Sequence, residues 1–560
     1  MGIGALLLDQ GLVTGEQLEA AIIEHRQTGV RLDRVLVEMG FVRADQVTKA
    51  VGEQLSMPIV DLSAISVDEQ TLRAIPPQVV FRQKCVPIER VNGDGRTERL
   101  RVATADPFEL AIYDELRLLT GCSIELVLAE EEELARFIRE HYGVGGDTLE
   151  ELSRGLDSID PDAPREDEDA EKAQEASVIR LVNELLFEAI ACRATDVHIE
   201  PYEHRLHVRY RVDGVLQRAN VPPTIHQFAG AIVSRIKIMA HLNIAEKRQP
   251  QDGRITVKRS GEVYDLRVSV IPMLFGEGVV LRILNKSAVL MGLDDLGMPE
   301  GVLRDWDGLI RKPHGILLVT GPTGSGKSTT LYASLNRIVS DEIKAITVED
   351  PVEYHVGGVN QIQVNHKVGL TFAAGLRSIL RHDPDVIMIG EIRDKETAEA
   401  AVQASLTGHL VFSTLHTNDA AGAMPRLLDM GVEPYLVASS IEGVLAQRLV
   451  RRVCPACAVS HEPEASELPA GFELAPGERL VIGEGCRNCL NTGYRGRLGI
   501  YEMMNVSEPL RELVMQHANA AKIAHLGIER GELTTLRDDG FTKVREGKTT
   551  LAEVARVTSI

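Results

Sequence analysis

One segment constrains this chain more than any other: the run Gly321-x4-Gly326-Lys327-Ser328, which directly follows an apolar stretch at residues 316–319. The apolar stretch has the length of a buried parallel strand, and the residues after the run have the spacing of a helix through residue 338. Glycines let backbone N–H groups turn toward phosphate oxygens, and the start of a helix adds its positive end. The sequence therefore predicts a phosphate-binding loop, and a plain glycine turn is the less favoured interpretation.

The side chains of this loop indicate a nucleoside triphosphate. Lys327 is expected to hold the β- and γ-phosphates of ATP, and the Ser328 hydroxyl is expected to bind Mg²⁺. The predicted nucleotide-binding residues are Gly321, Pro322, Thr323, Gly324, Ser325, Gly326, Lys327, Ser328 and Thr329.

Length and charge limit the class of protein. A chain of 560 residues is expected to form several domains. Its 61 basic and 82 acidic side chains give a net charge of −21, which disfavours a nucleic-acid partner. No apolar run approaches the ~20 residues that span a bilayer, and the first ten residues lack a secretory signal. We therefore expect a cytoplasmic protein whose membrane contact is peripheral.

Four of the seven cysteines form two C-x2-C pairs, Cys454/Cys457 and Cys486/Cys489, separated by 28 residues. In a reducing compartment, two such pairs favour a Zn²⁺ site over disulfides. Four thiolates complete a tetrahedron and leave no position open for water, so a structural Zn²⁺ site is expected. A redox role for one pair is the alternative.

The region before the phosphate loop divides by composition. Residues 1–55 repeat with a shift of 29, so that Leu7 aligns with Leu36, and each copy has the pattern of two short helices around a glycine turn. Residues 56–143 mix strand-like and helix-like patterns. Residues 144–176 are rich in Asp, Glu, Gly, Ser and Pro, which predicts an acidic flexible linker.

Residues 193–285 show the alternation typical of strands. Leu206, Val208 and Tyr210 belong to one strand face, and Arg209 and Arg211 to the other. A turn is predicted at Asp-Gly 213–214, a helix over 225–242, and further strands over 254–258 and 263–270. Two interpretations of Arg209 and Arg211 remain open: a solvated strand face, or arginine fingers that reach phosphates across a subunit boundary.

Charged side chains cap three predicted strands that follow the loop, at residues 345–348, 385–389 and 410–414. Glu353 and Glu391 come after the first two, and His409 and His416 flank the third. Because open α/β sheets bind ligands at the carboxyl ends of their strands, these residues are predicted to act on the nucleotide. Carboxylates there can activate a water molecule or bind the metal.

Residues 177–505 resemble the secretion and pilus-assembly ATPases, the GspE/PilB branch of the type II/IV secretion superfamily. The resemblance rests on Ala194-Thr-Asp-Val-His-Ile-Glu-Pro201, the phosphate loop, Glu349-Asp-Pro-Val-Glu353, residues 381–391 and Thr407-Gly-His-Leu-Val-Phe-Ser-Thr-Leu-His416. The tetracysteine insert also matches, and it favours an assembly motor over the retraction branch.

This resemblance implies a fold and a set of roles. The fold is α/β: a RecA-like P-loop NTPase domain preceded by a PAS-like α/β domain, with a tetracysteine zinc insert and a helical/α+β N-terminal module. The chain is expected to form a homo-hexamer. Glu353 takes the role of general base, Glu391 the Walker B role at Mg²⁺, His409 and His416 the sensing of the γ-phosphate, and Arg209 and Arg211 the role of fingers.

Residues 1–143 resemble the N-terminal module of the same ATPases, some of which bind cyclic di-GMP through two motifs that open Arg-Leu-Gly. Here Gly2 replaces the first Arg, and Asp33 replaces the second Gly. The first change removes a guanine-pairing cation, and the second places a carboxylate beside a dianion. We therefore favour a docking module, for an inner-membrane platform protein and a cytoplasmic partner, over a cyclic di-GMP site.

These patterns divide the chain into six parts: a docking module (1–143), a linker (144–176), a PAS-like domain (177–290), an ATPase core (291–450), a zinc subdomain (451–497) and a helical end (498–560). The predicted function is ATP hydrolysis to ADP and phosphate that powers pseudopilin or pilin assembly, in type II secretion or type IV pilus biogenesis. The alternative is a DNA-uptake or nucleic-acid translocating motor of the same superfamily.

Overall fold

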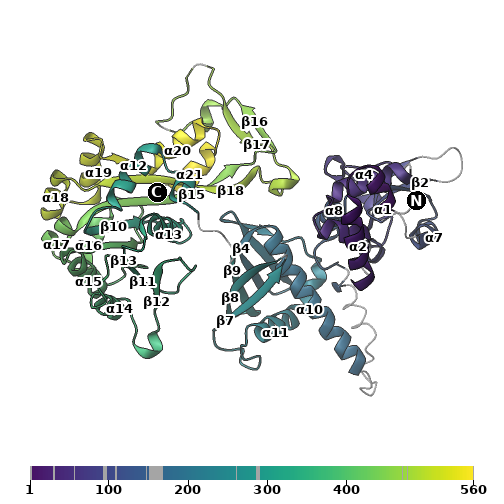
Figure 1. Cartoon of the computed structure of the whole chain (residues 1–560), viewed down its shortest axis with the longest axis horizontal. Helices are drawn as coiled ribbons and strands as arrows, with labels where there is room; N and C mark the ends of the chain where they lie inside the picture. Colours follow the sequence, from purple (N-terminus) through teal and green to yellow (C-terminus); the bar gives the residue numbers. More distant parts are fainter. Residues whose placement is uncertain are drawn as a thin grey trace. The chain divides into compact units, whose positions relative to one another are not determined.

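The computed structural model describes residues 3–28, 32–55, 57–91, 98–106, 110–146, 148–149, 168–259, 261–285, 291–469, 471–475 and 477–558. The chain divides into two units, Met1–Ile283 and Leu284–Ile560, and each is described by itself (Figure 1). None of the helices in the described part combines the length and the apolar composition needed to cross a bilayer.

The first unit begins with two helical repeats, as the 29-residue shift predicts. Gly11 and Gly40, at equivalent positions, both have positive φ (68° and 73°) in the turn between two helices. Leu7 and Leu36 are fully buried in one small core. The repeats comprise α1 (Ile3–Asp9), α2 (Gly15–Thr28), α3 (Leu32–Glu38) and α4 (Ala44–Leu55).

A three-stranded sheet of order β1-β2-β3 follows, with β1 and β2 antiparallel and β2 and β3 parallel. The apolar face of this sheet packs against the flanking helices and forms one core with them. Its elements are η1 (Leu62–Ala64), α5 (Glu69–Leu72), α6 (Pro77–Gln83), β1 (Cys85–Val91), β2 (Arg99–Thr104), α7 (Leu110–Thr120), β3 (Ser123–Leu128) and α8 (Glu131–Tyr142).

The predicted linker is shorter at both ends than its composition indicates. Val144 and Leu149 are buried in the core of the next sheet, 5% and 1% exposed, and the backbone N–H of Val144 donates to Asn220 O at 2.8 Å. Helix α10 begins at Glu168, before the predicted end of the linker. The acidic residues 150–167 lie outside the described residues. Two apolar side chains in an acidic segment suffice to anchor it, which composition alone does not reveal.

The rest of the first unit is a six-stranded sheet of order β6-β5-β4-β9-β8-β7, whose apolar face packs against α10 and α11. The Asp-Gly turn lies where predicted, with φ of 49° and 87° at Asp213 and Gly214. The predicted helix over 225–242 begins as a 3₁₀ segment. The elements are α10 (Glu168–Ala191), β4 (Ala194–Tyr202), β5 (Arg205–Val212), β6 (Val215–Arg218), η2 (Pro223–Phe228), α11 (Ala229–Met239), β7 (Gln251–Arg259), β8 (Glu262–Met273) and β9 (Gly276–Asn285).

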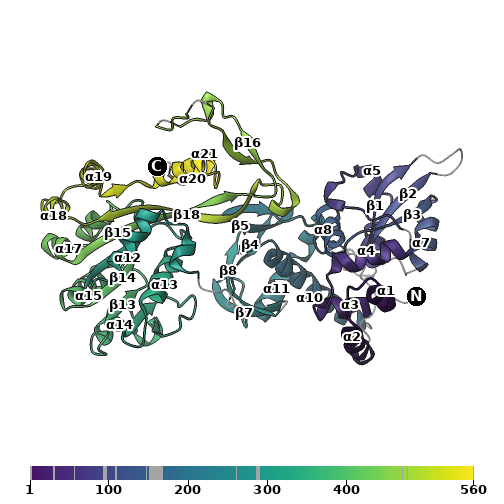
Figure 2. The same ribbon diagram turned by 45° about the horizontal axis from the view of Figure 1, so that its top comes forward.

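The second unit is built on an eight-stranded sheet of order β12-β11-β13-β14-β10-β15-β18-β19, covered on both faces (Figures 1 and 2). Ile316 and Leu318 of β10 pack with α14–α17, and Leu317 and Val319 pack with α12 and α13. A strand buried on both faces is uniformly apolar, which explains the run at 316–319. The strands from β12 to β15 are mutually parallel.

The elements of this layer are η3 (Leu293–Leu296), α12 (Glu300–Leu309), β10 (Gly315–Thr320), α13 (Lys327–Ile338), β11 (Ala345–Glu349), β12 (Val359–Gln363), η4 (His366–Val368), α14 (Phe372–Ile379), β13 (Val386–Ile389), α15 (Lys395–Leu406), β14 (Leu410–Leu415), α16 (Ala423–Asp429) and α17 (Pro434–Ser440).

Two long antiparallel strands, β15 (Ile441–Val453) and β18 (Tyr494–Asn505), extend this sheet and carry the cysteine-rich insert between them. The remaining elements are β16 (Ala458–His461), η5 (Ala465–Glu467), β17 (Leu480–Gly483), η6 (Arg487–Cys489), α18 (Glu508–Met515), α19 (Ala520–Glu529), β19 (Leu533–Thr534), α20 (Leu536–Arg545) and α21 (Leu551–Thr558).

Candidate active site

The loop between β10 and α13 has the backbone of a phosphate cradle. Gly321, Gly324 and Gly326 have positive φ values of 146°, 80° and 91°. A Cβ atom on Gly321 would lie 2.5 Å from Gln447 O, and one on Gly326 would lie 2.7 Å from Gln447 Nε2. The Ser325 hydroxyl is buried and has no hydrogen-bond partner among the described residues. A phosphate oxygen satisfies such a group, so the cradle fits a nucleotide.

Lys327 is held over this cradle by backbone. Its Nζ donates to Gly321 O at 2.8 Å and to Pro322 O at 2.9 Å. Burial lowers the pKa of Lys327 to about 8; the negative charge of Glu391 opposes this shift and the positive charge of Arg448 adds to it. A cation that is short of compensating charge is ready to receive the phosphates of ATP.

Glu391 and His416 come together at the carboxyl edge of the sheet. Glu391 follows β13 and His416 follows β14, and Glu391 Oε2 lies 3.2 Å from His416 Nε2. The other oxygen of Glu391 lies 2.5 Å from Arg393 Nη2. The Glu391 side chain is 13% exposed. The arrangement leaves a carboxylate beside Lys327, where Mg²⁺ bound to ATP requires an anionic partner.

Glu353 lies in the loop that follows β11. Its backbone N–H donates to the Tyr332 hydroxyl at 3.2 Å. Tyr332 belongs to α13, the helix that begins at Lys327, so the Glu353 loop is tied to the phosphate cradle. The Glu353 backbone therefore lies beside α13.

His409 lies at the opposite edge of the sheet, which corrects the expectation that both histidines flank the nucleotide. It precedes β14, and its carbonyl accepts from Gly315 N, where β10 begins. Its Nδ1 lies 2.9 Å from Ala404 O at the end of α15. One strand of about six residues separates it from the cradle, about 20 Å. In parallel strands, residues before and after a strand cannot share an edge, so only His416 reaches this site.

Arg209 and Arg211 lie in the first unit, on the polar face of its six-stranded sheet. Arg209 Nη2 lies 2.7 Å from Glu200 Oε2. Arg211 Nε lies 3.6 Å from Asp196 Oδ2, and its Nη1 donates to Gly214 O at 3.1 Å. Both side chains are about one-third exposed. Each guanidinium therefore has a partner within the chain and also faces solvent.

Sequence reasoning missed several polar residues around the cradle. Gln447 accepts from the Thr330 hydroxyl at 2.7 Å and fills the space beside Gly326. Arg448 donates to Asn418 O at 2.8 Å, and burial lowers its pKa. The signal in the sequence was an adjacent polar pair inside the apolar run of β15. Tyr332 gave no such signal, because a single aromatic residue in a helix has the pattern of a core residue.

The four predicted metal-binding cysteines form one cluster. Their sulfur atoms all lie within 4.8 Å of one another, and all seven cysteines of the chain are free of disulfides. Cys454 Sγ and Cys486 Sγ are 3.8 Å apart, as are Cys457 Sγ and Cys489 Sγ. A tetrahedron with Zn–S bonds of about 2.3 Å has edges of about 3.8 Å. The donor set therefore fits Zn²⁺.

Backbone donors prepare one of these thiols for metal binding. Burial raises the pKa of Cys489, but the N–H groups of Cys486 (3.1 Å) and Gly493 (3.3 Å) and the neighbouring thiols outweigh it, and the pKa falls to about 7. The thiolate is the form that binds metal.

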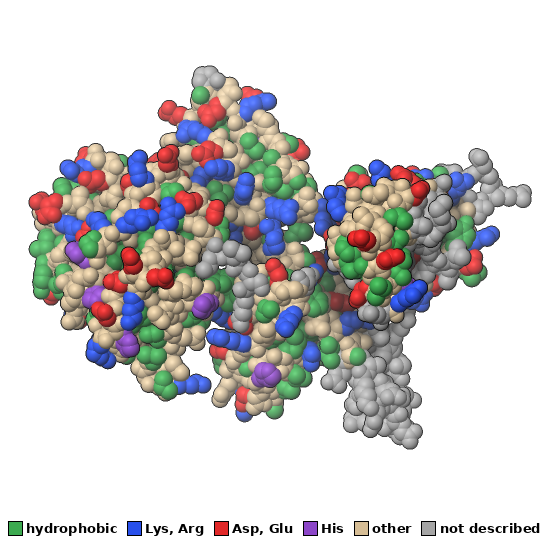
Figure 3. Space-filling model, in the orientation of Figure 1, with side chains coloured by type: hydrophobic (Ala, Val, Ile, Leu, Met, Phe, Trp, Pro, Cys, Tyr) green, Lys and Arg blue, Asp and Glu red, His purple; other side chains and the backbone are tan. Residues whose placement is uncertain are grey.

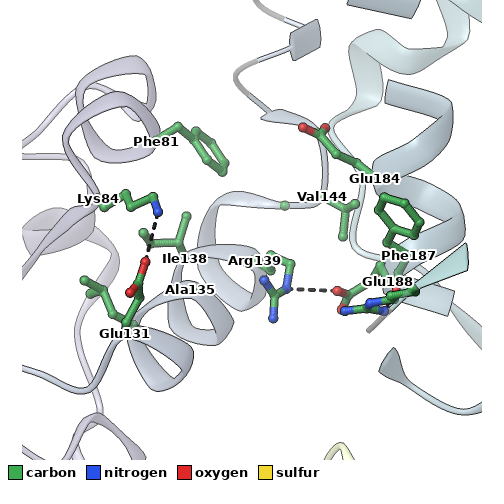
Figure 4. A pocket seen from close by; sticks show the side chains of 14 residues that line it. Phe81, Lys84, Glu131, Ala135, Ile138, Arg139, Val144, Glu184, Phe187 and Glu188 are labelled. Carbon is green, nitrogen blue, oxygen red and sulfur yellow. Dashed lines mark hydrogen bonds and ion pairs between the residues drawn. The ribbon is translucent and has the colours of Figure 1, made fainter. Parts of the chain in front are cut away.

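A separate cavity of about 350 Å³ lies in the first unit between α6, α8 and α10 (Figure 4). Phe81 and Phe187 supply aromatic walls. Its charged side chains already have protein partners: Lys84 Nζ lies 3.1 Å from Glu131 Oε1, and Arg139 Nε lies 2.9 Å from Glu188 Oε2. None of the predicted site residues lines this cavity.

The cradle, the carboxylates at the sheet edge and the sheet order together define a RecA-like P-loop nucleoside triphosphatase. The family model described as type II/IV secretion system protein matches residues 171–556. The chain belongs to this family, and it is an ATPase of secretion or pilus-assembly machinery. A second model, the MshEN domain, matches residues 55–148.

Relatives extend the match to the whole chain. The type IV pilus assembly ATPase PilB of Myxococcus xanthus is 43% identical over 99% of this chain and 98% of that protein. Type II secretion system protein E of Pectobacterium carotovorum is 46% identical over 87% of this chain and 97% of its own. Among solved structures, the Legionella pneumophila ATPase DotB covers 67% of this chain and 94% of its own with a TM-score of 0.50 and 21% identity, a likeness of fold.

Proposed function

We propose that this ATPase works as a homo-hexamer in the cytoplasm, at the inner face of the membrane, and powers the addition of pseudopilin or pilin subunits to a filament. The observation that carries the proposal is the convergence of Lys327, Glu391 and His416 at one edge of the sheet, with the Glu353 loop tied to the same cradle. The relative that matches 99% of this chain is named a type IV pilus assembly ATPase, and the one that matches 87% is named a type II secretion system protein.

The chemistry follows from these residues. Lys327 and the loop N–H groups hold the β- and γ-phosphates, and Glu353 accepts the proton of the attacking water. Ser328 and Glu391 would hold Mg²⁺, which neutralises phosphate charge when bound. His416, paired with Glu391, senses the γ-phosphate, and Arg209 and Arg211 supply positive charge from the neighbouring subunit. No covalent intermediate is needed, because phosphoryl transfer to water requires positioning and charge.

We further propose that the N-terminal module docks on a cytoplasmic partner and that the ring acts on an inner-membrane platform protein. Acidic and basic side chains are interspersed on the face of each unit shown in Figure 3, and the net charge is −21. This distribution favours protein partners over nucleic acid. For cyclic di-GMP, Gly2 lies outside the described residues, and Asp33 belongs to α3, where its carboxylate disfavours a dianionic ligand.

A phosphate-release assay with two variants tests the catalytic proposal. Lys327→Ala should abolish turnover and weaken nucleotide binding, because the main phosphate cation is lost. Glu353→Gln should bind ATP normally but turn over at least ~10²-fold more slowly, the usual effect of removing a general base. Near-normal turnover in Glu353→Gln would remove this residue from the mechanism. An exposed glutamate far from the site, Glu529, gives the matched control, Glu529→Gln.

A further inference from the structure

The hydroxyl of Tyr332 connects α13, the helix that begins at Lys327, to the loop that carries Glu353. It donates to Glu349 Oε2, at the end of β11, and it accepts from the backbone N–H of Glu353 at 3.2 Å. A phenol has one proton and lone pairs to accept with, so both contacts are satisfied at once. Tyr332 is five residues into α13, whose first residue is Lys327, about 7.5 Å along the helix axis.

Glu349 is a buried carboxylate that the proposed chemistry does not use. It is 4% exposed, and its Oε1 accepts from the Thr347 hydroxyl at 2.7 Å and from Gln361 Nε2 at 3.0 Å. Both oxygens are therefore occupied by protein donors. A carboxylate held in this way serves as a fixed acceptor around which neighbouring groups are arranged.

The loop that carries Glu353 is held at a second point by the same network. Gln361 on β12 donates to Tyr354 O at 3.0 Å and accepts from Val356 N at 2.9 Å. The loop between β11 and β12 is thus fastened on one side by Tyr332 and on the other by Gln361. Of these two, only Tyr332 belongs to the helix that begins at the phosphate cradle.

We propose that Tyr332 is a positioning residue that sets the distance between the Glu353 carboxylate and the γ-phosphate held at Lys327. It acts through the loop backbone and touches neither nucleotide nor metal. The inference rests on the proposed role of Glu353 as general base. It adds that the cradle and the base move as one piece, because one rigid helix carries the lysine and fixes the loop.

The tyrosine is suited to this task over a wide pH range. Burial raises its pKa well above the ordinary value of a phenol, and the neighbouring Glu349 raises it further. The hydroxyl consequently stays protonated and continues to donate to Glu349. The Tyr332 ring also packs edge-on against Tyr354, with 6.3 Å between centroids, and a phenylalanine would keep that contact.

Tyr332→Phe removes the hydroxyl alone. We expect kcat for ATP to fall 10- to 100-fold, while the Kd for a fluorescent ATP analogue changes less than threefold, because the cradle itself is intact. Tyr501 provides the matched control: it is 1% exposed in the same unit, and its hydroxyl donates to Leu296 O at 2.9 Å. Tyr501→Phe should lower Tm by a similar amount and leave kcat within twofold of wild type. Equal kcat losses in the two variants would overturn the proposal, as would a Tyr332→Phe enzyme with normal kcat.

A double variant separates this inference from the role of Glu353. If Tyr332 acts through Glu353, Tyr332→Phe should cost less than twofold in a Glu353→Gln background. A full additional loss there would overturn the positioning role. An active Glu353→Gln enzyme would instead contradict the role of general base, and an inactive wild-type protein would contradict the proposed function.

Hydrogen–deuterium exchange gives a readout that does not depend on turnover. Tyr332→Phe should speed amide exchange at least fivefold in residues 350–356, with little change in α13 or in β10. Unchanged protection of residues 350–356 would show that the hydroxyl does not hold the loop, and would overturn the inference.

Discussion

At the scale of single residues, polar groups of the phosphate loop lack full compensation for the cost of their burial. The buried Ser325 hydroxyl has no partner among the described residues, and Lys327 has only backbone carbonyls and the nearby Glu391 to oppose the cost of burial. Both features destabilise the nucleotide-free site, and a bound phosphate group removes both costs. The binding energy should therefore come mainly from the triphosphate and less from the nucleobase.

The lowered pKa of Lys327 leads to a pH prediction. The free site loses its positive charge as pH rises through about 8, whereas bound phosphates hold the proton on the lysine. ATP affinity should therefore be nearly constant below pH 7 and fall about tenfold between pH 7 and pH 9. Titration with a fluorescent ATP analogue measures this. Lys327→Arg, whose charge persists, should show a flat profile over the same range; a flat wild-type profile would contradict the prediction.

At the scale of elements, the long β15–β18 pair connects the ATPase sheet to the cysteine cluster. Cys454 follows β15 directly, and Cys489 lies five residues before β18. The small β16–β17 ribbon is the only sheet described within this insert. A structure of that size needs a metal or another cross-link to be stable, so the cluster is expected to fix the insert.

Metal analysis of purified protein should find one Zn²⁺ per chain. Cys454→Ser should reduce zinc content and increase proteolysis within residues 454–493, because a tetrahedral site with three thiolates binds weakly. Nucleotide binding should stay within about twofold, since none of the hydrogen bonds found among the described residues joins the cradle to the insert. Cys192→Ser, which alters a cysteine outside the cluster, serves as the control. Zinc-free wild-type protein with a folded insert would disprove the assignment.

A second element-scale contact fastens the last helix to β15. Glu553 of α21 is 2% exposed; it lies 2.6 Å from Arg451 Nη2 and 2.7 Å from Arg556 Nη2. Burial raises its pKa, but the two arginines and the Arg451 N–H outweigh this and lower it to about 2. A depressed carboxyl pKa stabilises the fold above the unfolded value, and the stabilisation is lost as pH falls from about 4.5 toward 2.

Glu553→Gln should therefore lower the free energy of unfolding at pH 7 by about 2–3 kcal/mol, because the partly buried Arg451 and the more exposed Arg556 lose the buried carboxylate that balances their charge. The difference from wild type should shrink below pH 4. Thermal unfolding followed by circular dichroism at several pH values measures this. Glu546→Gln, at a half-exposed ion pair, should have little effect. An equal difference at pH 7 and pH 3 would contradict the explanation.

At the scale of the whole molecule, the candidate fingers and the cradle belong to different units. Arg209 and Arg211 lie on the sheet of the first unit, and Lys327 begins a helix of the second. If the fingers act across a subunit boundary, two inactive variants can complement each other. A mixed ring then contains some interfaces that combine intact fingers with an intact cradle.

Mixing Arg209→Ala/Arg211→Ala subunits with Lys327→Ala subunits should restore a measurable part of the wild-type ATPase rate, about one-quarter of the interfaces for random equal mixing. Phosphate release on mixing after dissociation and reassembly measures this. Arg205→Ala, at an exposed position on the same strand, is the control and should be active alone. No recovery in reassembled mixed rings would contradict fingers supplied by a neighbour.

Local patterns predicted much of this architecture. The strands at 316–319, 345–348, 385–389 and 410–414 were predicted from continuous apolar runs, and the Asp-Gly hairpin from its turn residues. The ends of the linker were not predicted correctly, because Val144 and Leu149 are two apolar residues in an acidic context and their burial depends on α10. The position of His409 was not predicted correctly, because a motif gives only the order of residues along the chain. In a parallel sheet, the residues before a strand and those after it lie at opposite edges.

The sequence by itself determined the phosphate loop, the two C-x2-C pairs and the alternation of the arginine-bearing strand, since each depends on short spacings that backbone geometry translates directly into structure. Only the tertiary structure decided which strand ends meet, which histidine reaches the cradle, and that Tyr332 and Glu349 join α13 to the Glu353 loop. Contacts of this second kind link residues far apart in the chain, and sheet order and packing, which no local pattern encodes, bring them together.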